Sequence, residues 1–600
     1  MNDHVLDALE LPETLRHRIL CRVSPAPSEA SKRRSFVLYL PTVVLRKRHN
    51  PAFALACRLA NQYHVPLVVL CTVLDDQHLS RKPLNPVCMT ARRLAFTLEA
   101  LQSCTKEWEA HGAGVVIRVH GPGSRNPHHL SLIHKSTAVV SDEPFVEPFR
   151  TYLRNVVITS HSAKVPCFTV DGSTTVPPNS MLKLAADQSI SGDLMFTGVP
   201  LKAWIWEKQT NVDRKAQVYA ATRSGFFNAP DLDVKLTKNF ILEDEERLEN
   251  AAETSRIVEL MPSRWKSKDV PCPGLRPWTV AELCSISNLK EWAMKEWPGA
   301  DISVPPCKQT HGSFAAAEQR WQSFLDHGLK DYAKRRNQIV LPHAVSRSSC
   351  YLNLGVLSIF DVVQDVWEAK AERKGYSAGC AKFLDEVVKW REIGYAHTFA
   401  SPRYHTGQAI PNWARAYLGG MQCEEKSSGY DYRQLESAGT QDETWNAMQT
   451  YLVETGELHN NARMTWGKTV VHWQATMVSP EEVLWQLCTL NDRFALDGMS
   501  PPSYAGLLWC FGWGDKAWPD GSVSTKWAHR YRTKPDGFEQ AKENLFSGFA
   551  LSHAFAARET ANARPTKKLR LEEGNSASWN TQSKTILSFF SPTPKAEPVK

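Results

Sequence analysis

The stretch "PLVVLCTVL", residues 66–74, is an almost uninterrupted apolar run, and the fold can be inferred from it. Similar short segments surround it: "SFVLYLP" (35–41), "GVVIRVHG" (114–121), "TAVVSDE" (137–143) and "VPCFTVDG" (165–172). Continuous apolar strands are typical of a parallel sheet that is covered on both faces. Residues 51–62 and 91–111 between them have the pattern of amphipathic helices. We therefore predict an α/β, parallel-sheet (Rossmann-like) domain at 35–172, with ligands at the carboxyl ends of its strands.

The sequence changes character on both sides of this domain. Residues 1–34 are predicted to be a polar leader without a secretory signal, and 173–312, rich in proline, a long wrapping connector. Residues 313–550 are predicted to be an all-α domain, because "TQDETWNAMQTYLVETGEL" repeats its apolar residues with a helical period and "SPEEVLWQL" begins with a capping box. Residues 551–600 have few large apolar groups, so we expect them to be disordered.

The composition narrows the function. No apolar run approaches the roughly 20 residues that a membrane helix needs, so we expect no membrane-spanning segment. The 14 cysteines form no CxxC pair, which argues against a zinc site, and we expect no metal. A net charge of +8 permits a polyanionic partner without requiring one. The 20 tryptophans fit either an aromatic core or stacking and electron transfer between indoles.

Two polar motifs indicate ligand binding. In "VSRSSCYLNLG" (345–355), small hydroxyls precede a helix, which suits a phosphate, although an ordinary serine-capped helix has the same pattern. In "FLDEVVKWREIGYAH" (383–397), Glu386 and Trp390 are four residues apart and share a helix face. A carboxylate beside an indole could bind a flat polar heterocycle; the alternative is a surface ion pair beside a half-buried tryptophan.

Two more motifs complete a recognisable order: "GELHNNARMTWGKTVVHW" (456–473) and "NDRFALDGMSPPSYAGLLW" (491–509). An α/β domain, a connector and a helical domain with these four motifs in this order resemble the DNA photolyase/cryptochrome family over residues 35–550. The spellings "NAMQ" and "LNDRFALDG", and the spacing from Glu386 to Trp390, are most similar to the class II branch. The resemblance implies that the helical domain binds FAD.

The resemblance also implies an activity. It favours a photo-lyase that splits cyclobutane pyrimidine dimers in UV-damaged DNA by electron transfer from photoexcited, reduced FAD. A cryptochrome-like blue-light photoreceptor without repair activity is the alternative, and a flavin-free DNA-binding protein is a third. The lesion type, cyclobutane dimer or (6-4) product, stays open, as does an antenna chromophore in the first domain. We expect a monomer.

The resemblance assigns roles to single residues. For FAD it implies Tyr332, Ser346, Ser348, Ser349, Gly498 and an ion pair of Arg463 with Asp497. For the lesion it implies Glu386, with Trp390 and Trp518 packing on it. For DNA it implies Arg336, Asn337, Trp390, Arg391 and Arg530. From helix spacing, we consider Trp466, Trp473 and Trp485 candidates for electron relay to the flavin.

Four positions depart from the family pattern. Val345 replaces the threonine of the serine-rich turn, and Asn353 replaces a histidine. Ser500 and Pro502 replace an aspartate and the asparagine that the family places near flavin N5. Because proline offers neither an amide side chain nor an N–H, we expect the redox and protonation preference of the flavin to differ here.

The tail carries two short motifs. "ARPTKKLRLEE" (563–573), with Lys567, Lys568 and Arg570, resembles a nuclear localisation signal, although it could be a solvated charge run. "TQSKTILSFFSPTPK" (581–595) places three large apolar residues in a polar segment, as in the sliding-clamp (PCNA) binding box, and a chance aromatic tail is the alternative. These three residues are Ile586, Phe589 and Phe590.

Overall fold

The structure is a computed structural model that describes residues 4–24, 35–74, 89–120, 128–178, 203–225, 227–233, 278–295, 300–401, 403–421, 429–514 and 537–544, with the single positions 180, 236, 517, 519, 522 and 523. The described residues all lie in the compact unit Met1–Phe549. Several predicted functional residues lie outside the described residues: Trp518, Arg530, Lys567, Lys568, Arg570, Ile586, Phe589 and Phe590.

A six-stranded sheet forms the N-terminal part of the chain, with the order β1-β6-β5-β2-β3-β4. Five of its strands run parallel: β2 (Phe36–Leu40), β3 (Leu67–Val73), β4 (Gly114–Val119), β5 (Ser136–Asp142) and β6 (Cys167–Val170). Each of the five occupies a segment predicted as a strand, so the prediction of a parallel α/β sheet is confirmed.

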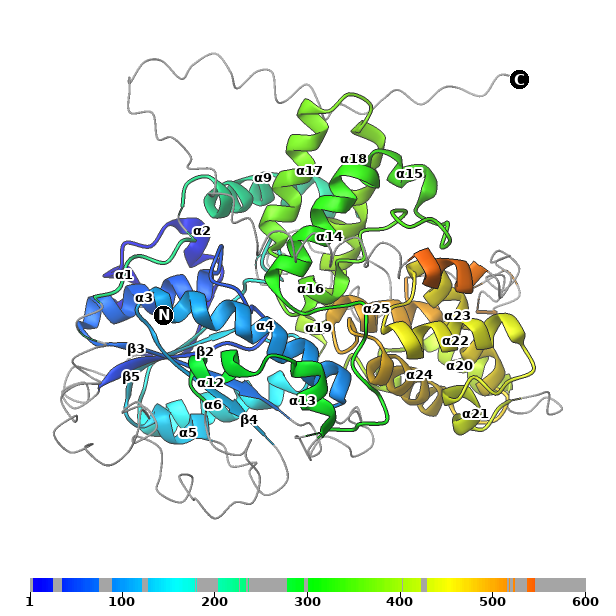
Figure 1. Cartoon of the computed structure of the whole chain (residues 1–600), viewed down its shortest axis with the longest axis horizontal. Helices are drawn as coiled ribbons and strands as arrows, with labels where there is room; N and C mark the ends of the chain where they lie inside the picture. The colour runs from blue at the N-terminus through cyan, green and yellow to red at the C-terminus, as the bar shows by residue number, and fades with distance from the viewer. Residues whose placement is uncertain are drawn as a thin grey trace. The chain divides into compact units, whose positions relative to one another are not determined.

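Successive residues of the central strands point to opposite faces of the sheet, which explains why these strands are apolar throughout. Val37 and Val69 join one core cluster, whereas Leu38 and Val68 join another. Figure 1 shows helices on both sides of the sheet. They are α3 (Pro51–Tyr63) and α4 (Ala91–Ala110) on one side, and α5 (His128–Ile133) and α6 (Phe149–Ala163) on the other.

Residues 4–24 are more than a polar leader, and that prediction was wrong for them. They form α1 (His4–Asp7), α2 (Glu13–Arg16) and β1 (Ile19–Val23), and β1 pairs antiparallel with β6 at the sheet edge. In β1, Ile19 and Val23 are buried, Leu20 and Cys21 are partly exposed and Arg22 is exposed, so the strand lacks the apolar run of its neighbours. The sheet domain therefore begins before residue 35.

The remainder of the described chain is helical, as predicted for the C-terminal part. Within the described residues after 312 no strand occurs, and no described helix is long and apolar enough to cross a membrane. The connector contributes α9 (Ala203–Thr222), α12 (Val280–Ser285) and α13 (Leu289–Lys295). The helical part contains α14 (Phe314–His327), α15 (Tyr332–Arg335), α16 (Ser349–Asn353), α17 (Ile359–Glu372), α18 (Ser377–Leu384), α19 (Arg391–Ala400), α20 (Asn412–Gly420), α21 (Tyr432–Glu436), α22 (Glu443–Thr455), α23 (Asn460–Gln474), α24 (Pro480–Phe494) and α25 (Pro501–Cys510). Shorter turns are the 3-10 helices η5 (Leu329–Asp331) and η7 (Gly407–Ala409) and the π-helix η6 (Asp385–Trp390).

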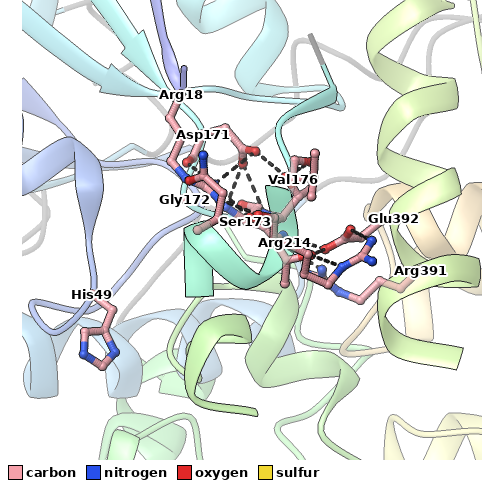
Figure 2. Close-up of polar contacts among 12 residues, drawn as sticks. Arg18, His49, Asp171, Gly172, Ser173, Val176, Arg214, Arg391 and Glu392 are labelled. Atoms are coloured by element: carbon pink, nitrogen blue, oxygen red, sulfur yellow. Dashed lines mark hydrogen bonds and ion pairs between the residues drawn. The ribbon is translucent and has the colours of Figure 1, made fainter. Parts of the chain in front are cut away.

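The turn that follows β6 joins the sheet to the helical part, and a buried arginine holds it. The Arg18 side chain has no exposed surface. Its Nε donates to Gln217 at 2.7 Å, and its terminal nitrogens donate to the carbonyls of Thr174 and Thr175 at 2.8 and 2.7 Å. Figure 2 shows the Arg18 side chain directed toward the turn at residues 171–176. Arg18 thus replaces the sheet hydrogen bonds that this turn lacks.

The other side of the same turn holds α19. The buried carboxylate of Glu392 accepts from the backbone N–H and the hydroxyl of Thr175, at 2.5 and 2.7 Å, and pairs with Arg214 of α9 at 3.3 Å. Arg391 donates to the carbonyl of Ser173 at 2.9 Å (Figure 2). The start of α19 is therefore fixed against the carboxyl end of β6.

Replacing Arg18 should destabilise the fold. Arg18→Met leaves several buried carbonyls without a donor, so we expect the free energy of unfolding to fall by about 3 kcal/mol or more. Urea unfolding followed by circular dichroism measures it. Arg16→Met is the matched control: Arg16 pairs with Asp7 at the surface, and we expect a loss below about 1 kcal/mol. Equal losses for both variants would contradict the role given to Arg18.

Candidate functional site

A cavity of about 330 Å³ lies among α15, α16, η6, α19, α23 and α25, and we call it the central cavity. It brings together residues from all four sequence motifs. The predicted residues that line it are Tyr332, Arg336, Ser346, Ser348, Ser349, Glu386, Arg391, Arg463 and Asp497. Segments that are more than 150 positions apart thus share one wall, and the structure assembles most of the predicted site.

A largely buried carboxylate, that of Glu457, holds the serine-rich turn in place through Arg347. Glu457 accepts from Arg347 at 2.7 Å, from Arg320 at 2.9 Å and from the Thr310 hydroxyl at 2.9 Å. Burial alone would raise the pKa of Glu457, but the two arginines lower it to about 2. Arg347 itself has a left-handed backbone, with φ of 54°, which lets its side chain turn away from the hydroxyls of Ser346 and Ser348. Both serines line the cavity, where the Ser348 hydroxyl donates to the Ser346 carbonyl at 3.3 Å and the Ser346 hydroxyl accepts from Ser348 N at 3.4 Å.

The predicted ion pair of Arg463 with Asp497 is present, and it joins the third motif to the fourth. Arg463 Nη2 lies 2.8 Å from Asp497 Oδ1, and both side chains are more than four-fifths buried. The Nε of Arg463 is buried and has no hydrogen-bond partner among the described residues. A buried guanidinium N–H without an acceptor fits a ligand that brings an acceptor or a negative charge. Together with the serine hydroxyls, it makes the cavity suitable for a phosphate-bearing cofactor with a polar ring.

Glu386 lies on η6, where the helix widens into a π-turn. Its carboxylate pairs with Arg336 and with Lys382, both at 2.8 Å. The nearby Tyr332 ring is buried against Phe383, with centroids 5.3 Å apart. Burial, together with the charge of Glu386, raises the pKa of Tyr332 to about 12, so its hydroxyl keeps its proton at neutral pH. This wall of the cavity therefore has three kinds of polar group: the Glu386 carboxylate, the cations of Arg336 and Lys382 that pair with it, and the Tyr332 hydroxyl.

Three predicted residues lie elsewhere or are engaged otherwise. Gly498 lines a smaller cavity instead of the central one. A glycine is needed there by close packing, since a Cβ at this position would lie 2.9 Å from the Cα of Asp492. Arg391 lines the cavity and donates to the Ser173 carbonyl and to the Tyr395 hydroxyl, and its contact with DNA phosphates stays a prediction. Asn337 is exposed beside Arg336 and does not line the cavity.

The consecutive prolines begin α25 at the cavity wall. Pro501 and Pro502 occupy its first two positions, where a backbone N–H has no helical partner anyway. Ser500 caps the helix by accepting from Ser503 N at 3.3 Å. Gly394 of α19 packs closely here, since a Cβ on it would lie 2.9 Å from the carbonyl oxygen of Pro501. Pro502 and Ser500 both line the cavity, so the sequence departures are within the site.

An indole row leads away from the cavity wall. Trp466, one turn beyond Arg463 on α23, stacks on Trp445 with centroids 6.4 Å apart and planes 6° apart. Trp445 in turn contacts Trp473, with centroids at 5.6 Å. Trp466 and Trp445 are buried while Trp473 is partly exposed, so the row connects the interior to solvent. Trp445 was not among the predicted relay residues, because its position in a helical apolar pattern is typical of core.

The other candidate indoles lie outside this row. Trp485 packs on Tyr432, with centroids 6.0 Å apart, and its relay role stays a prediction. Trp390 does not line the central cavity; it contacts Trp509 edge-on, with centroids 5.3 Å apart. It nevertheless lies four residues after Glu386 on η6, so the two predicted lesion residues remain on one element.

Known proteins with similar sequences share one activity name. The chain is 31% identical over 215 residues to the deoxyribodipyrimidine photo-lyase of Methanothermobacter thermautotrophicus, covering 36% of this chain and 46% of that protein. It is 33% identical over 204 residues to the enzyme of that name from Oryza sativa subsp. japonica, covering 34% and 39%. Over these stretches the chain is therefore similar in sequence to deoxyribodipyrimidine photo-lyases, in agreement with the predicted resemblance to the DNA photolyase/cryptochrome family. The matches span less than half the length of these curated relatives.

A solved structure agrees with this family's fold. The crystal structure of a Synechocystis sp. PCC6803 cryptochrome matches with a TM-score of 0.51 at 14% identity, covering 84% of this chain and 88% of that one. No protein-family model matches the chain. A photolyase/cryptochrome fold therefore consists here of the mixed sheet and the helical part that encloses the central cavity.

The smaller cavity, of about 90 Å³, lies at the carboxyl ends of β2 and β3. Its lining is mostly apolar and includes Cys71, Phe96, Phe145 and Met499. The sequence predicted ligands at this edge of the sheet, and the structure has a small hollow there. An antenna chromophore in it stays an open proposal.

Neutralising Glu457 should loosen the serine-rich turn. Because its folded-state pKa is lowered to about 2, the stabilisation is complete above about pH 4.5 and is lost as the pH falls toward 2. Glu457→Gln should therefore lower the free energy of unfolding by about 3 kcal/mol at pH 7, and by less at pH 3. Urea unfolding at both pH values tests this. Glu454→Gln, which removes a half-exposed partner of Lys542, should cost below about 1 kcal/mol at either pH.

Proposed function

We propose that this chain is a light-dependent DNA repair enzyme, a deoxyribodipyrimidine photo-lyase that splits cyclobutane pyrimidine dimers with FAD bound in the central cavity. The observation that carries the proposal is the meeting of Ser348, Glu386, Arg463 and Asp497, from four separate motifs, around one cavity. The name of the curated relatives supports it. The sequences "NAMQ" and "LNDRFALDG", which are most similar to those of class II members, favour the class II branch.

The donors of the central cavity suit FAD. Ser346, Ser348 and Ser349 would hold its phosphates, and the pair of Arg463 with Asp497 would lie by the flavin ring. When bound and fully reduced, FAD supplies on light absorption the electron that opens the dimer. The unpaired Nε–H of Arg463 would stabilise a negative charge on the ring, because a buried donor gains most from an anionic acceptor.

Glu386 would hold the damaged base. Its carboxylate is oriented by Arg336 and Lys382, and it keeps acceptor capacity for a pyrimidine N–H beyond these two pairs. Trp390 offers an aromatic surface on the same element, as proteins that bind flipped-out bases commonly do. UV-damaged DNA is therefore the proposed substrate and partner, and a monomer suffices for it.

The alternative is a cryptochrome-like photoreceptor of the same fold that does not repair DNA. Ser500 and Pro502, at the cavity wall, favour it, because they depart from the family residues expected beside flavin N5. A change at that position would act on the protonation of the ring rather than on its binding.

The tail adds two proposals about cellular context. Lys567, Lys568 and Arg570 would direct the protein to the nucleus, and Ile586, Phe589 and Phe590 would dock on the sliding clamp (PCNA). Both fit a repair enzyme of nuclear DNA. They are supported by the sequence motifs alone.

Repair should depend on Glu386. We expect purified protein with reduced flavin to restore dimer-containing DNA under blue light, and Glu386→Gln to lower the repair yield about tenfold or more, because a charge-assisted hydrogen bond is lost. Glu372→Gln, on the exposed end of α17, should leave it unchanged. The assay is run on cyclobutane dimers and on (6-4) products. Bound, reduced flavin without repair of either lesion would favour the photoreceptor, and full activity of Glu386→Gln would overturn the site assignment.

The indole row should carry electrons to the cavity. Trp445→Phe keeps the packing but replaces the middle indole with a ring that is much harder to oxidise. We expect the photoreduction of bound oxidised flavin, followed by its absorbance under blue light with a thiol donor, to slow at least about tenfold. Trp367→Phe on α17 is the control. Trp485→Phe tests the remaining candidate; an effect larger than that of Trp445→Phe would show that the relay does not follow the row.

A further inference from the structure

The π-turn η6 brings together two residues that an α-helix would separate. In an α-helix, side chains three or four positions apart are neighbours, whereas a π-turn has i to i+5 hydrogen bonds and so places residues five apart one above the other. Asp385 and Trp390 are the first and last residues of η6. The indole Nε1 of Trp390 donates to Asp385 Oδ2 at 3.2 Å. The pair exists because the helix is locally widened.

The Trp390 ring is held on three sides. Besides the bond to Asp385, Lys389 Nζ lies 5.0 Å from the ring centroid, and Trp509 meets the ring at 80° with centroids 5.3 Å apart. Of these contacts, only the one with Asp385 is a directional hydrogen bond to the indole N–H, so it determines how the ring is rotated within its plane.

Asp385 is itself fixed in place. It pairs with Lys382 at 2.6 Å and with Lys389 at 3.2 Å. Partial burial raises the pKa of this carboxyl, but the hydrogen bonds and charges of the two lysines outweigh burial, and the net shift is downward. The group is therefore an ionised acceptor at neutral pH. Lys382 also pairs with Glu386, so one lysine links the acceptor of the indole to the proposed acceptor of the base.

We infer that Asp385 is a positioning residue that orients the Trp390 ring for stacking on the damaged base. The inference rests on the proposed function, because only a lesion-binding site gives Trp390 a base to stack on. Asp385 acts through Trp390 and does not itself contact DNA or cofactor.

The direction in which DNA affinity changes when Asp385 is replaced distinguishes a positioning role from a general electrostatic effect. Removing an acidic side chain raises the net positive charge, which by itself strengthens the binding of any DNA. If Asp385 orients Trp390, its removal must instead weaken the binding of dimer-containing DNA relative to undamaged DNA. A residue with a merely structural role would lower both affinities together.

The experiment compares Asp385→Ala, Asp385→Asn and the control Asp331→Ala, a partly exposed carboxylate 3.9 Å from Arg335. Binding of a single-dimer duplex and of the same duplex without the dimer is measured at one salt concentration in the dark. We expect Asp385→Ala to lose about tenfold of the preference for the dimer, since one charge-assisted hydrogen bond is removed. Asp385→Asn retains an acceptor for the indole and should recover most of the preference, and Asp331→Ala should keep it.

Two results would overturn the inference. An unchanged preference for dimer-containing DNA in Asp385→Ala would show that Asp385 is not needed to orient the Trp390 ring. An Asp385→Asn variant as impaired as Asp385→Ala would assign the effect to the ion pairs with Lys382 and Lys389 instead.

A second measurement does not depend on DNA. In 5-fluorotryptophan-labelled protein, the fluorine resonance that Trp390→Phe removes should move in Asp385→Ala and return toward its place in Asp385→Asn. If wild-type protein does not prefer dimer DNA, the proposed function fails, yet this resonance still decides whether Asp385 orients the ring. A resonance that stays in place in Asp385→Ala overturns the positioning role.

Discussion

Glu392 is the constraint on which the site depends. It is a carboxylate without exposed surface, and such a group is tolerated only when it is paired and fully hydrogen-bonded. Its partners are Thr175, on the turn after β6, and Arg214 of the connector helix α9. Since Glu392 directly follows Trp390 and Arg391, its position sets the register of the whole segment from η6 into α19. The sheet and the connector thereby position the cavity wall.

Arg214 extends this constraint into the π-turn. Besides pairing with Glu392, its Nη2 donates to the carbonyl of Val388 at 3.2 Å. A π-turn departs from the regular α-helical hydrogen-bond pattern, and a cation that donates to one of its carbonyls helps to stabilise the widened turn. The connector, which the sequence predicts to be a wrapping segment, therefore supports the element that carries Glu386 and Trp390.

The sequence predicts those parts of the molecule whose signal is local. The strands of the parallel sheet were found because both of their faces are buried, and the cavity residues because they recur in fixed motifs. β1 was missed because only its two ends are buried. The contact of Asp385 with Trp390 was missed for a different reason: residues five apart face each other only in a π-turn, and an α-helical period of 3.6 separates them. Trp445 shows the same limit, since a buried indole at a helical core position has an identical pattern whether it fills space or carries electrons.

The two ends of the cavity differ in the hydrogen-bonding groups that they present, and the two prolines account for the difference. At the serine-rich turn, three hydroxyls line the wall. At α25 the situation is the reverse: among the described residues 500–504, Pro501 and Pro502 have no N–H, Ser503 N donates to Ser500 Oγ, and Tyr504 N donates to Ser500 O. No backbone donor of this first turn is left for a ligand, although the start of a helix usually provides several. Polar contact with a cofactor from this side must therefore come from side chains. The ion pair of Arg463 with Asp497, which lines the cavity, can provide it. The prolines remove hydrogen bonding at the place where the family has an amide, and they leave the ion pair to determine the charge of whatever the cavity binds.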